Sequence, residues 1–198
     1  MVPFKTQLFY LHGFNSGFDP KNQKVKELER LADVVTGRTT NYLIKLDVVE
    51  LKSTIKSAVE GFDGETILVG TSLGGYFARY FSKELGLRCI IINPSVDPSM
   101  SLARAIGEQT NYLTGQTYEV TKAQVEQLAS YSVSVTEDCL MILCTDDDVI
   151  DYKKPLKKYG QGAKVVITTG GHRLESLNTV SDDIQTFINM MPTNDYPL

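Results

Sequence analysis

The sequence predicts an α/β protein built as a three-layer sandwich, with a mainly parallel sheet between two layers of helices. Three observations lead to this fold class. Short apolar runs alternate along the chain with amphipathic helical patterns. The apolar runs are nearly continuous, as expected for strands that are buried on both faces of a parallel sheet. The chain has 198 residues, of which 42% are hydrophobic and 22% charged, and this suits one globular domain.

Six apolar runs are the expected strands of this sheet. Runs of this kind that end in glycine or polar residues are typical of buried strands. They cover residues 7–11, 42–46, 66–69, 89–92, 139–144 and 164–168.

Helical patterns fill the intervals between the expected strands. The first helix is predicted to begin with Asp19 as its N-cap and Pro20 at its first helical position. Apolar residues at helical spacing predict further helices over residues 48–59 and 179–190. The helix that follows the third strand is expected to end at Gly86.

Residues 95–138 interrupt this alternation. The stretch is richer in Ser, Thr and Gln than the rest of the chain and contains no convincing strand. Two helical segments are plausible, over residues 99–107 and 121–130. We therefore expect a single domain over residues 1–198, with residues 95–138 as a cap-like insertion over the carboxyl edge of the sheet.

Composition argues against several classes of function. The net charge of −4 speaks against a nucleic-acid partner, which usually requires a basic face. No apolar run approaches the roughly 20 residues of a membrane span, and the N-terminal residues lack a signal-peptide pattern. These features predict a cytoplasmic protein. With only His12 and His172, and three cysteines without ligand spacing, no metal site is expected.

Residues 70–74, Gly-Thr-Ser-Leu-Gly, match the nucleophile-elbow pattern G-x-S-x-G. A serine on a very tight turn between strand and helix needs small residues two positions before and after it. Its hydroxyl then stands at the N-terminus of a helix, where the helix dipole favours a developing oxyanion. Because an apolar strand precedes the motif and an amphipathic helix follows it, Ser72 is the candidate nucleophile. The alternative is a glycine-rich turn used only for packing.

His172 is the candidate general base. It follows the strand expected at residues 164–168, at the sheet edge where open α/β proteins place their ligands. It is also the only histidine after Ser72, and the hydrolase order is Ser, then Asp, then His. The alternative is a histidine in a surface loop.

The acid is expected between these two residues. Residues 145–151 follow a strand directly and contain four aspartates. A buried aspartate here could orient the imidazole and stabilise its charged form. We prefer Asp147, then Asp148. A metal-binding acidic loop is the alternative, although the spacing differs from that of a calcium loop.

The loop after the first strand, His12-Gly13-Phe14, resembles an oxyanion-hole loop. In α/β-hydrolases such a loop supplies one backbone N–H, and the residue after the nucleophile supplies the second. Phe14 and Leu73 are therefore the predicted oxyanion-hole residues. His12 would shape the loop; the rival hypothesis is that His12 is the general base.

Taken together, these segments resemble an α/β-hydrolase of the YqiA-like esterase family over nearly the whole chain. The specific pieces are Leu-His-Gly-Phe-Asn-Ser, Asn-Pro and Tyr-x-Thr-Gly-Gln, in addition to the elbow. The carriers are residues 10–16, 69–76, 91–96, 111–116, 145–152 and 170–172.

The resemblance implies an α/β-hydrolase fold and a serine esterase that acts on short acyl esters or acyl-CoA thioesters, without metal or organic cofactor. It places the nucleophile on Ser72, the acid on Asp147 and the base on His172. The chain departs from the family pattern at two positions. Asp146 stands where the family usually has Gly, and no residue separates Gly171 from His172, where the family usually has one.

Three functions are therefore compatible with the sequence. The first is a carboxylesterase or thioesterase that forms an acyl-enzyme on Ser72 and takes a small-molecule ester or thioester. The second is a binding protein on a hydrolase fold whose triad is idle. The third is an acyltransferase or peptidase that uses the same triad. No oligomeric state is predicted.

Overall fold

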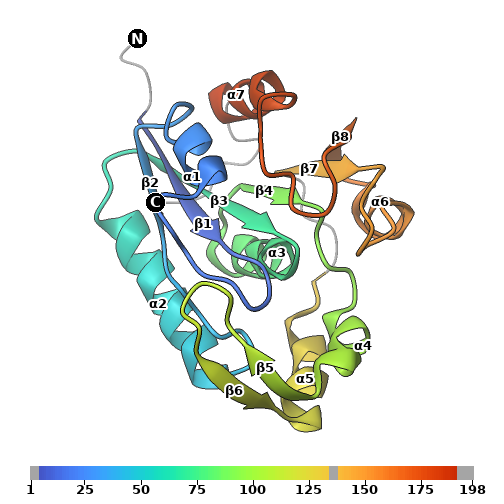
Figure 1. Cartoon of the computed structure of the whole chain (residues 1–198). Helices are drawn as coiled ribbons and strands as arrows, with labels where there is room; N and C mark the ends of the chain where they lie inside the picture. The colour runs from blue at the N-terminus through green and yellow to red at the C-terminus, as the bar shows by residue number, and fades with distance from the viewer. Residues whose placement is uncertain (1–4, 134–137, 191–198) are drawn as a thin grey trace.

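The computed structural model describes residues 5–133 and 138–190, and a six-stranded sheet runs through its centre (Figure 1). The strand order is β2-β1-β3-β4-β7-β8, and every neighbouring pair is parallel. The strands are β1 (Thr6–Leu11), β2 (Val34–Gly37), β3 (Glu65–Thr71), β4 (Cys89–Ile92), β7 (Cys139–Cys144) and β8 (Ala163–Thr168). Parallel strands point their carboxyl ends to one edge, so the loops that follow them meet there.

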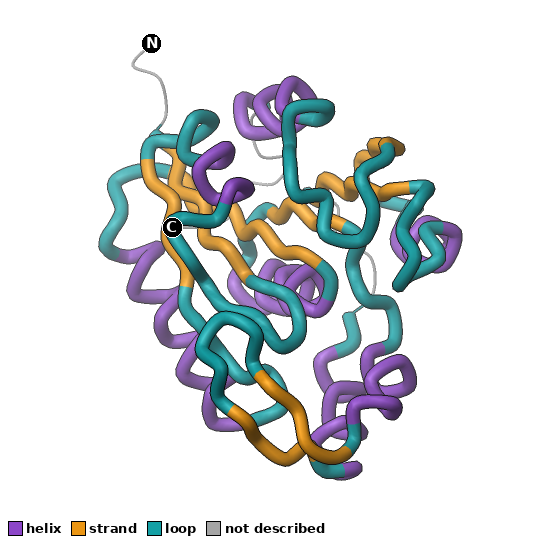
Figure 2. The backbone as a smooth tube through the Cα atoms, in the orientation of Figure 1, coloured by secondary structure: helices purple, strands orange, loops and turns teal. Residues whose placement is uncertain are grey.

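Helices cover both faces of this sheet, which gives the three layers predicted from the sequence (Figure 2). One face carries α2 (Lys45–Glu60), α3 (Leu73–Leu85) and α6 (Lys153–Tyr159). The other face carries α1 (Gln23–Leu28) and α7 (Ser181–Asn189).

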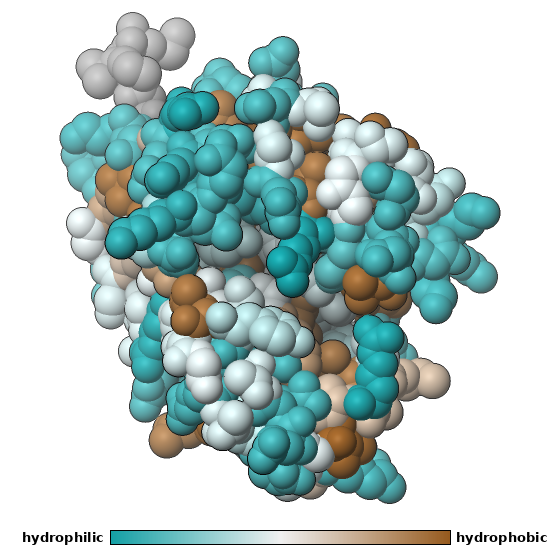
Figure 3. Space-filling model, in the orientation of Figure 1, coloured by the Kyte–Doolittle hydropathy of each residue, from teal (hydrophilic) through white to brown (hydrophobic). Residues whose placement is uncertain are grey.

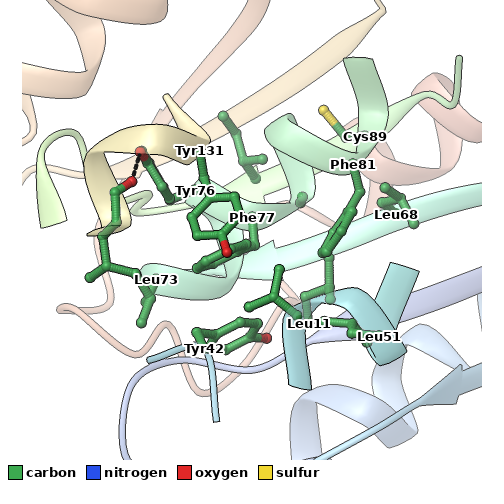
Figure 4. Close-up of a cluster of buried hydrophobic side chains, with 14 of the residues drawn as sticks. Leu11, Tyr42, Leu51, Leu68, Leu73, Tyr76, Phe77, Phe81, Cys89 and Tyr131 are labelled. Carbon is green, nitrogen blue, oxygen red and sulfur yellow. Dashed lines mark hydrogen bonds between the residues drawn. The ribbon is translucent and has the colours of Figure 1, made fainter. Parts of the chain in front are cut away.

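Each face of the sheet has its own hydrophobic core, because successive side chains of a strand point to opposite sides. In β3, Leu68 lies in the core under α2 and α3, whereas Ile67 and Val69 lie in the core under α1 and α7. In the first core, aromatic rings gather around the helix that follows the elbow (Figure 4). Phe77 stacks on Tyr42 with ring centroids 4.6 Å apart. The elbow therefore precedes a helix whose first seven residues, Leu73 to Arg79, are all buried.

Five of the six expected strands are confirmed, at β1, β3, β4, β7 and β8, as are the helices expected over residues 48–59 and 179–190. Gly86 ends α3 in the left-handed conformation, with φ 66°. Among the described residues, no helix has the length and apolarity that a membrane span requires. The face in Figure 3 is mostly hydrophilic, and its hydrophobic side chains form small separate patches.

The strand expected over residues 42–46 is wrong. Helix α2 begins at Lys45, and Tyr42 and Leu43 are buried in the turn before it. Their apolar character reflects packing against α3, such as the stacking of Tyr42 on Phe77, and not strand pairing. The second strand is β2, which pairs with β1 at the sheet edge and is only partly buried. A short, half-exposed edge strand lacks the continuous apolar run that identifies the central ones.

The predicted start of the first helix is also wrong. Helix α1 begins at Gln23, and the side chain of Asn22 accepts a hydrogen bond of 3.0 Å from the N–H of Lys24 as its cap. Asp19 instead accepts from the N–H of Lys21 at 2.8 Å, which closes a turn that precedes the helix. Aspartate and asparagine suit both a turn and a cap, so the sequence alone favoured the earlier one.

Residues 95–133 contain a strand pair that the sequence did not predict. The strands β5 (Gly107–Thr110) and β6 (Thr117–Val120) form an antiparallel hairpin. Their residues alternate between exposed and partly or fully buried, and the exposed ones are polar, which conceals the strand pattern. The short helical segments expected on either side are present as α4 (Pro98–Ser101), η1 (Leu102–Ala105), α5 (Lys122–Glu126) and η2 (Gln127–Tyr131).

Candidate active site

Ser72 stands at a tight turn between β3, which ends at Thr71, and α3, which begins at Leu73. Its backbone has φ 57° and ψ −119°, a conformation that residues other than glycine rarely adopt. Neighbouring backbone fixes it in place: its N–H donates to Ile92 O at 2.9 Å, and its carbonyl accepts from Ser95 N at 3.0 Å. The turn therefore presents the hydroxyl at the carboxyl edge of the sheet.

Two glycines make this turn possible. A Cβ atom on Gly70 would lie 2.2 Å from Gly74 O, and a Cβ atom on Gly74 would lie 2.1 Å from Leu11 O. Both contacts are with backbone atoms that cannot move aside. The elbow spacing in the sequence thus has a steric cause in this structure, which excludes any side chain at either position.

Ser72, His172 and Asp147 lie in one hydrogen-bonded chain. Ser72 Oγ is 3.0 Å from His172 Nε2, and His172 Nδ1 is 2.8 Å from Asp147 Oδ2. An aspartate carboxylate only accepts hydrogen bonds, so Nδ1 carries the proton. Nε2 of the neutral ring then accepts from the serine hydroxyl. Although no residue separates Gly171 from His172, the imidazole is within hydrogen-bond distance of Ser72.

Among the aspartates of residues 145–151, only Asp147 contacts the imidazole. Its side chain is 1% exposed, and its second oxygen accepts from the N–H groups of Val149 and Ile150, each at 2.8 Å. Asp148 is exposed. The carboxylate of Asp147 is thus held on both oxygens, with one of them directed at His172, whose side chain is 17% exposed.

The two residues predicted to form the oxyanion hole are Phe14, which follows Gly13, and Leu73, which follows Ser72. Leu73 is the first residue of α3, where the N–H has no partner within the helix. Gly13 approaches Ser72 closely, since a Cβ atom placed on it would lie 3.6 Å from Ser72 Cβ. In the described part of the chain, no hydrogen bond is donated by the N–H of Phe14 or Leu73. The structure therefore brings the loop that contains Phe14 close to the elbow, next to Leu73.

His12 has both ring nitrogens engaged in the backbone. Nε2 accepts from Thr40 N at 3.0 Å, so Nδ1 carries the proton and donates to Gly13 O at 2.7 Å. Burial lowers the pKa of His12, which keeps the ring neutral. The imidazole of His12 therefore links the loop after β1 to Thr40, which agrees with the expectation that His12 shapes this loop. The rival hypothesis that His12 is the general base would require a free ring nitrogen, and both nitrogens are bound to backbone here.

Asn93 is a residue at the site that the sequence reasoning did not identify. It follows β4 with φ 43°, and its buried side chain reaches two other segments. Nδ2 donates to the carbonyls of Gly171 and His172, each at 3.0 Å, and Oδ1 accepts from Cys144 N at 2.8 Å. One side chain thereby ties the loop of His172 to the end of β7. The sequence feature that could have identified Asn93 is its position directly after a strand, at the carboxyl edge of the sheet where the site lies.

Helix α1 holds the chain just after His172. The buried ammonium of Lys24 donates to the carbonyl of Arg173 and, at 3.3 Å, to Thr71 Oγ1. Burial lowers the pKa of Lys24 to about 8. Glu27 accepts from the N–H of Leu177 and from Ser176 Oγ. Neither Lys24 nor Glu27 is predicted from the sequence as part of the site.

The β5–β6 hairpin lies beside the loop after β1 (Figure 1). Tyr112 N donates to Asn15 O at 2.8 Å, and Asn111 Nδ2 donates to Ser16 O at 2.8 Å. Asn15 Nδ2 in turn donates to Gln109 Oε1 at 2.9 Å. The hairpin therefore contacts the residues that directly follow Phe14. Across residues 5–133 and 138–190, no three His, Cys, Asp or Glu side chains converge on a possible metal position.

Residues 7–190 match the family described as Uncharacterised protein family (UPF0227). The chain belongs to the UPF0227 family. A UPF0227 protein of Vibrio vulnificus is 30% identical over 151 residues, which span 74% of this chain and 78% of that protein. A UPF0227 protein of Vibrio campbellii is 23% identical over 187 residues, which span 92% of this chain and 99% of the relative. The YqiA-like resemblance drawn from the motifs is confirmed.

Solved structures with similar folds are α/β-hydrolases. Est1E from Butyrivibrio proteoclasticus has a TM-score of 0.67 at 14% identity, over 94% of this chain and 88% of its own. Alpha/beta hydrolase domain-containing protein 10 from mouse has a TM-score of 0.64 at 14% identity, over 96% and 89%. The Pyrococcus furiosus esterase Pf2001 has a TM-score of 0.62 at 14% identity, over 94% and 79%. This UPF0227 protein therefore has the α/β-hydrolase fold.

Proposed function

We propose that this protein is a serine hydrolase, a carboxylesterase or thioesterase that forms an acyl-enzyme on Ser72. One observation carries the proposal: Ser72 Oγ, His172 and Asp147 form a continuous hydrogen-bonded chain, with distances of 3.0 and 2.8 Å. A serine hydroxyl is a weak nucleophile until a neighbouring base removes its proton. Here the base is within hydrogen-bond distance, and a buried carboxylate orients it.

In the acylation step, Ser72 Oγ attacks the carbonyl carbon of the ester while its proton moves to His172 Nε2. The imidazolium that forms is stabilised by Asp147, which receives a hydrogen bond from Nδ1 and keeps its own charge. The carbonyl oxygen becomes an oxyanion and accepts hydrogen bonds from the N–H groups of Phe14 and Leu73. His172 then gives the proton to the departing alcohol or thiol, and the acyl group remains on Ser72.

Deacylation reverses these roles with water as the nucleophile. His172 takes a proton from a water molecule, which attacks the acyl carbon. The second tetrahedral intermediate uses the same two N–H groups. It collapses when His172 returns the proton to Ser72 Oγ, and the carboxylic acid leaves. In each half of the cycle His172 takes up one proton and gives one back, so the protons balance with substrate and water alone.

The substrate we propose is a small-molecule ester or thioester. The hairpin contacts at residues 15 and 16 support a role for residues 95–138 as the roof of the acyl-binding side, within a single domain over residues 1–198. An acyltransferase or peptidase would use the same residues. Competition between water and an added alcohol or amine in a product assay separates these reactions.

The proposal is tested with a fluorophosphonate probe and a p-nitrophenyl acetate assay. Wild type should be labelled on Ser72, and Ser72→Ala should lose both the label and, by several orders of magnitude, the turnover. His172→Ala should lose turnover to a similar extent. Ser53→Ala, on the exposed side of α2, is the matched control and should keep both signals.

Two outcomes contradict the proposal. The first is an unlabelled wild type that hydrolyses neither esters nor thioesters across a series of acyl-chain lengths, which is the result expected of an idle binding protein. The second is labelling that persists in Ser72→Ala.

A further inference from the structure

The loop that carries His172 starts where the sheet ends. The last backbone hydrogen bond between the ends of strands β7 and β8 is donated by Thr145 N to Thr168 O, at 2.9 Å. Beyond it the backbone of residues 169–171 has no strand neighbour to pair with. Gly170 and Gly171 both have positive φ, of 141° and 66°. Two consecutive glycines give this segment many accessible conformations, so His172 needs an added constraint to stay in one place.

The carboxylate of Asp146 supplies hydrogen bonds at this point. Its Oδ1 accepts from Gly170 N at 2.9 Å and from Gly171 N at 3.0 Å, and its Oδ2 lies 3.1 Å from Gly170 N. The hydrogen bonds from Gly171 and then Gly170 lower the pKa of the Asp146 carboxyl, because both favour its charged form. The acceptor is therefore a carboxylate at neutral pH.

Three consecutive residues of the loop after β7 thus bind three successive parts of the segment that runs from the end of β8 to His172. Thr145 pairs with Thr168, Asp146 binds the N–H groups of the glycine pair, and Asp147 contacts the ring of His172. Neighbouring aspartates have different tasks: one binds backbone and the other binds the imidazole.

Asn93 holds the next peptide groups of the same loop through their carbonyls. It donates to the carbonyls of Gly171 and His172, whereas Asp146 accepts from the N–H groups of Gly170 and Gly171. Amides and carbonyls of one short segment are therefore bound by separate side chains. Without Asp146, only the carbonyl side is held, and the glycine pair can rotate.

We propose that Asp146 is a positioning residue, which fixes the backbone before His172 so that the ring reaches Ser72 and Asp147 together. This inference rests on the proposed function, because positioning matters only if His172 acts as the base. Asp146 acts through the loop: its hydrogen bonds are to the backbone of residues 170 and 171. It is not a catalytic residue, and its removal should affect the rate more than substrate binding.

The test compares Asp146→Ala and Asp146→Asn with Asp151→Ala. Asp151 is a matched control, since its exposed carboxylate also accepts a backbone N–H, from Lys153 at 3.1 Å, but outside the His172 loop. With p-nitrophenyl acetate, Asp146→Ala should lower kcat about 10- to 100-fold with KM within about twofold. Asp146→Asn keeps an amide oxygen as acceptor and should recover part of kcat. Asp151→Ala should match wild type.

A proton NMR spectrum gives a second readout that does not depend on turnover. The Nδ1–H proton between His172 and Asp147 should resonate far downfield in wild type and in Asp151→Ala, and it should broaden or vanish in Asp146→Ala. The proposal is overturned if Asp146→Ala keeps the wild-type kcat, or if kcat falls while this resonance is unchanged. If wild type itself neither hydrolyses esters nor takes the phosphonate, the proposed function fails, and the resonance still reports on positioning.

Discussion

Ser72 and His172 lie 3.0 Å apart, yet the structure holds them in place by different means. Ser72 stands between the central strand β3 and the buried helix α3, where Gly70 and Gly74 leave no space for a side chain. Its position follows from steric exclusion by neighbouring backbone atoms and from backbone hydrogen bonds to Ile92 and Ser95.

His172, in contrast, follows the edge strand β8, whose residues are only partly buried. Polar side chains from three other segments bind the backbone around it: Asn93 after β4, Asp146 after β7 and Lys24 in α1. These residues are distant in sequence from the loop that they hold. The comparison teaches that backbone packing and backbone hydrogen bonds place the nucleophile, whereas side-chain hydrogen bonds from other segments place the base.

Gly74→Ala should have the largest effect of the substitutions that test this comparison. The new Cβ atom would lie 2.1 Å from Leu11 O, a backbone atom of the central strand β1. We expect a loss of about 3 kcal/mol or more in the free energy of unfolding, with loss of esterase activity. Urea unfolding followed by circular dichroism measures it.

Gly13→Ala is the control for this steric argument. It lies in the same region, but its nearest contacts would be at 3.6 Å, an ordinary van der Waals distance. Its unfolding free energy should stay within about 1 kcal/mol of wild type. Equal stability of the two variants would show that steric exclusion does not fix the elbow.

Asn93→Asp tests whether side-chain hydrogen bonds hold the His172 loop, and it should have an intermediate effect. The aspartate keeps an acceptor for Cys144 N but cannot donate to the carbonyls of Gly171 and His172. We expect a loss of about 1–3 kcal/mol in unfolding free energy and a fall of about 10-fold in kcat.

Asn41→Asp is the matched substitution. The side chain of Asn41 accepts from Leu43 N through Oδ1, a bond that an aspartate retains. Its stability and kcat should therefore remain at the wild-type level, within about 0.5 kcal/mol and twofold. If Asn93→Asp behaves in the same way, the buried amide does not hold the His172 loop.

His12 should give the smallest effect, a dependence of stability on pH. Burial lowers the pKa of His12 in the folded protein, so the unfolded chain binds this proton more readily. The stability associated with neutral His12 is therefore complete above the unfolded pKa of about 6.5 and declines as the pH falls toward the folded pKa. Urea unfolding at several pH values should show this decline in wild type and a weaker one in His12→Gln.

An NMR titration checks the same prediction directly. The chain has two histidines, so the spectrum contains two imidazoles, and His12→Gln assigns them. His12 should titrate below about pH 6.5 and carry its proton on Nδ1. Titration of His12 at or above this value would contradict its role as a buried, neutral link between Gly13 and Thr40.

Much of the fold could be predicted because it depends on local patterns. The central strands β4 and β7 have the bounds that their apolar runs indicate. The edge strand β2 and the β5–β6 hairpin were missed, since half-exposed strands carry polar residues and lack that signal. The strand expected over residues 42–46 was wrong for the opposite reason: Tyr42 lies in a turn, and its aromatic packing also produces an apolar run.

The sequence by itself determined five of the six strands of the main sheet, the elbow around Ser72, and His172 as the only histidine that follows it. Their signals are the periodicity of apolar residues and the glycine spacing of the elbow, which short stretches of sequence display directly. Only the tertiary structure decided which aspartate contacts His172, and that Asn93, Asp146 and Lys24 bind the loop around it. The physical reason is that these hydrogen bonds join segments that folding alone brings together.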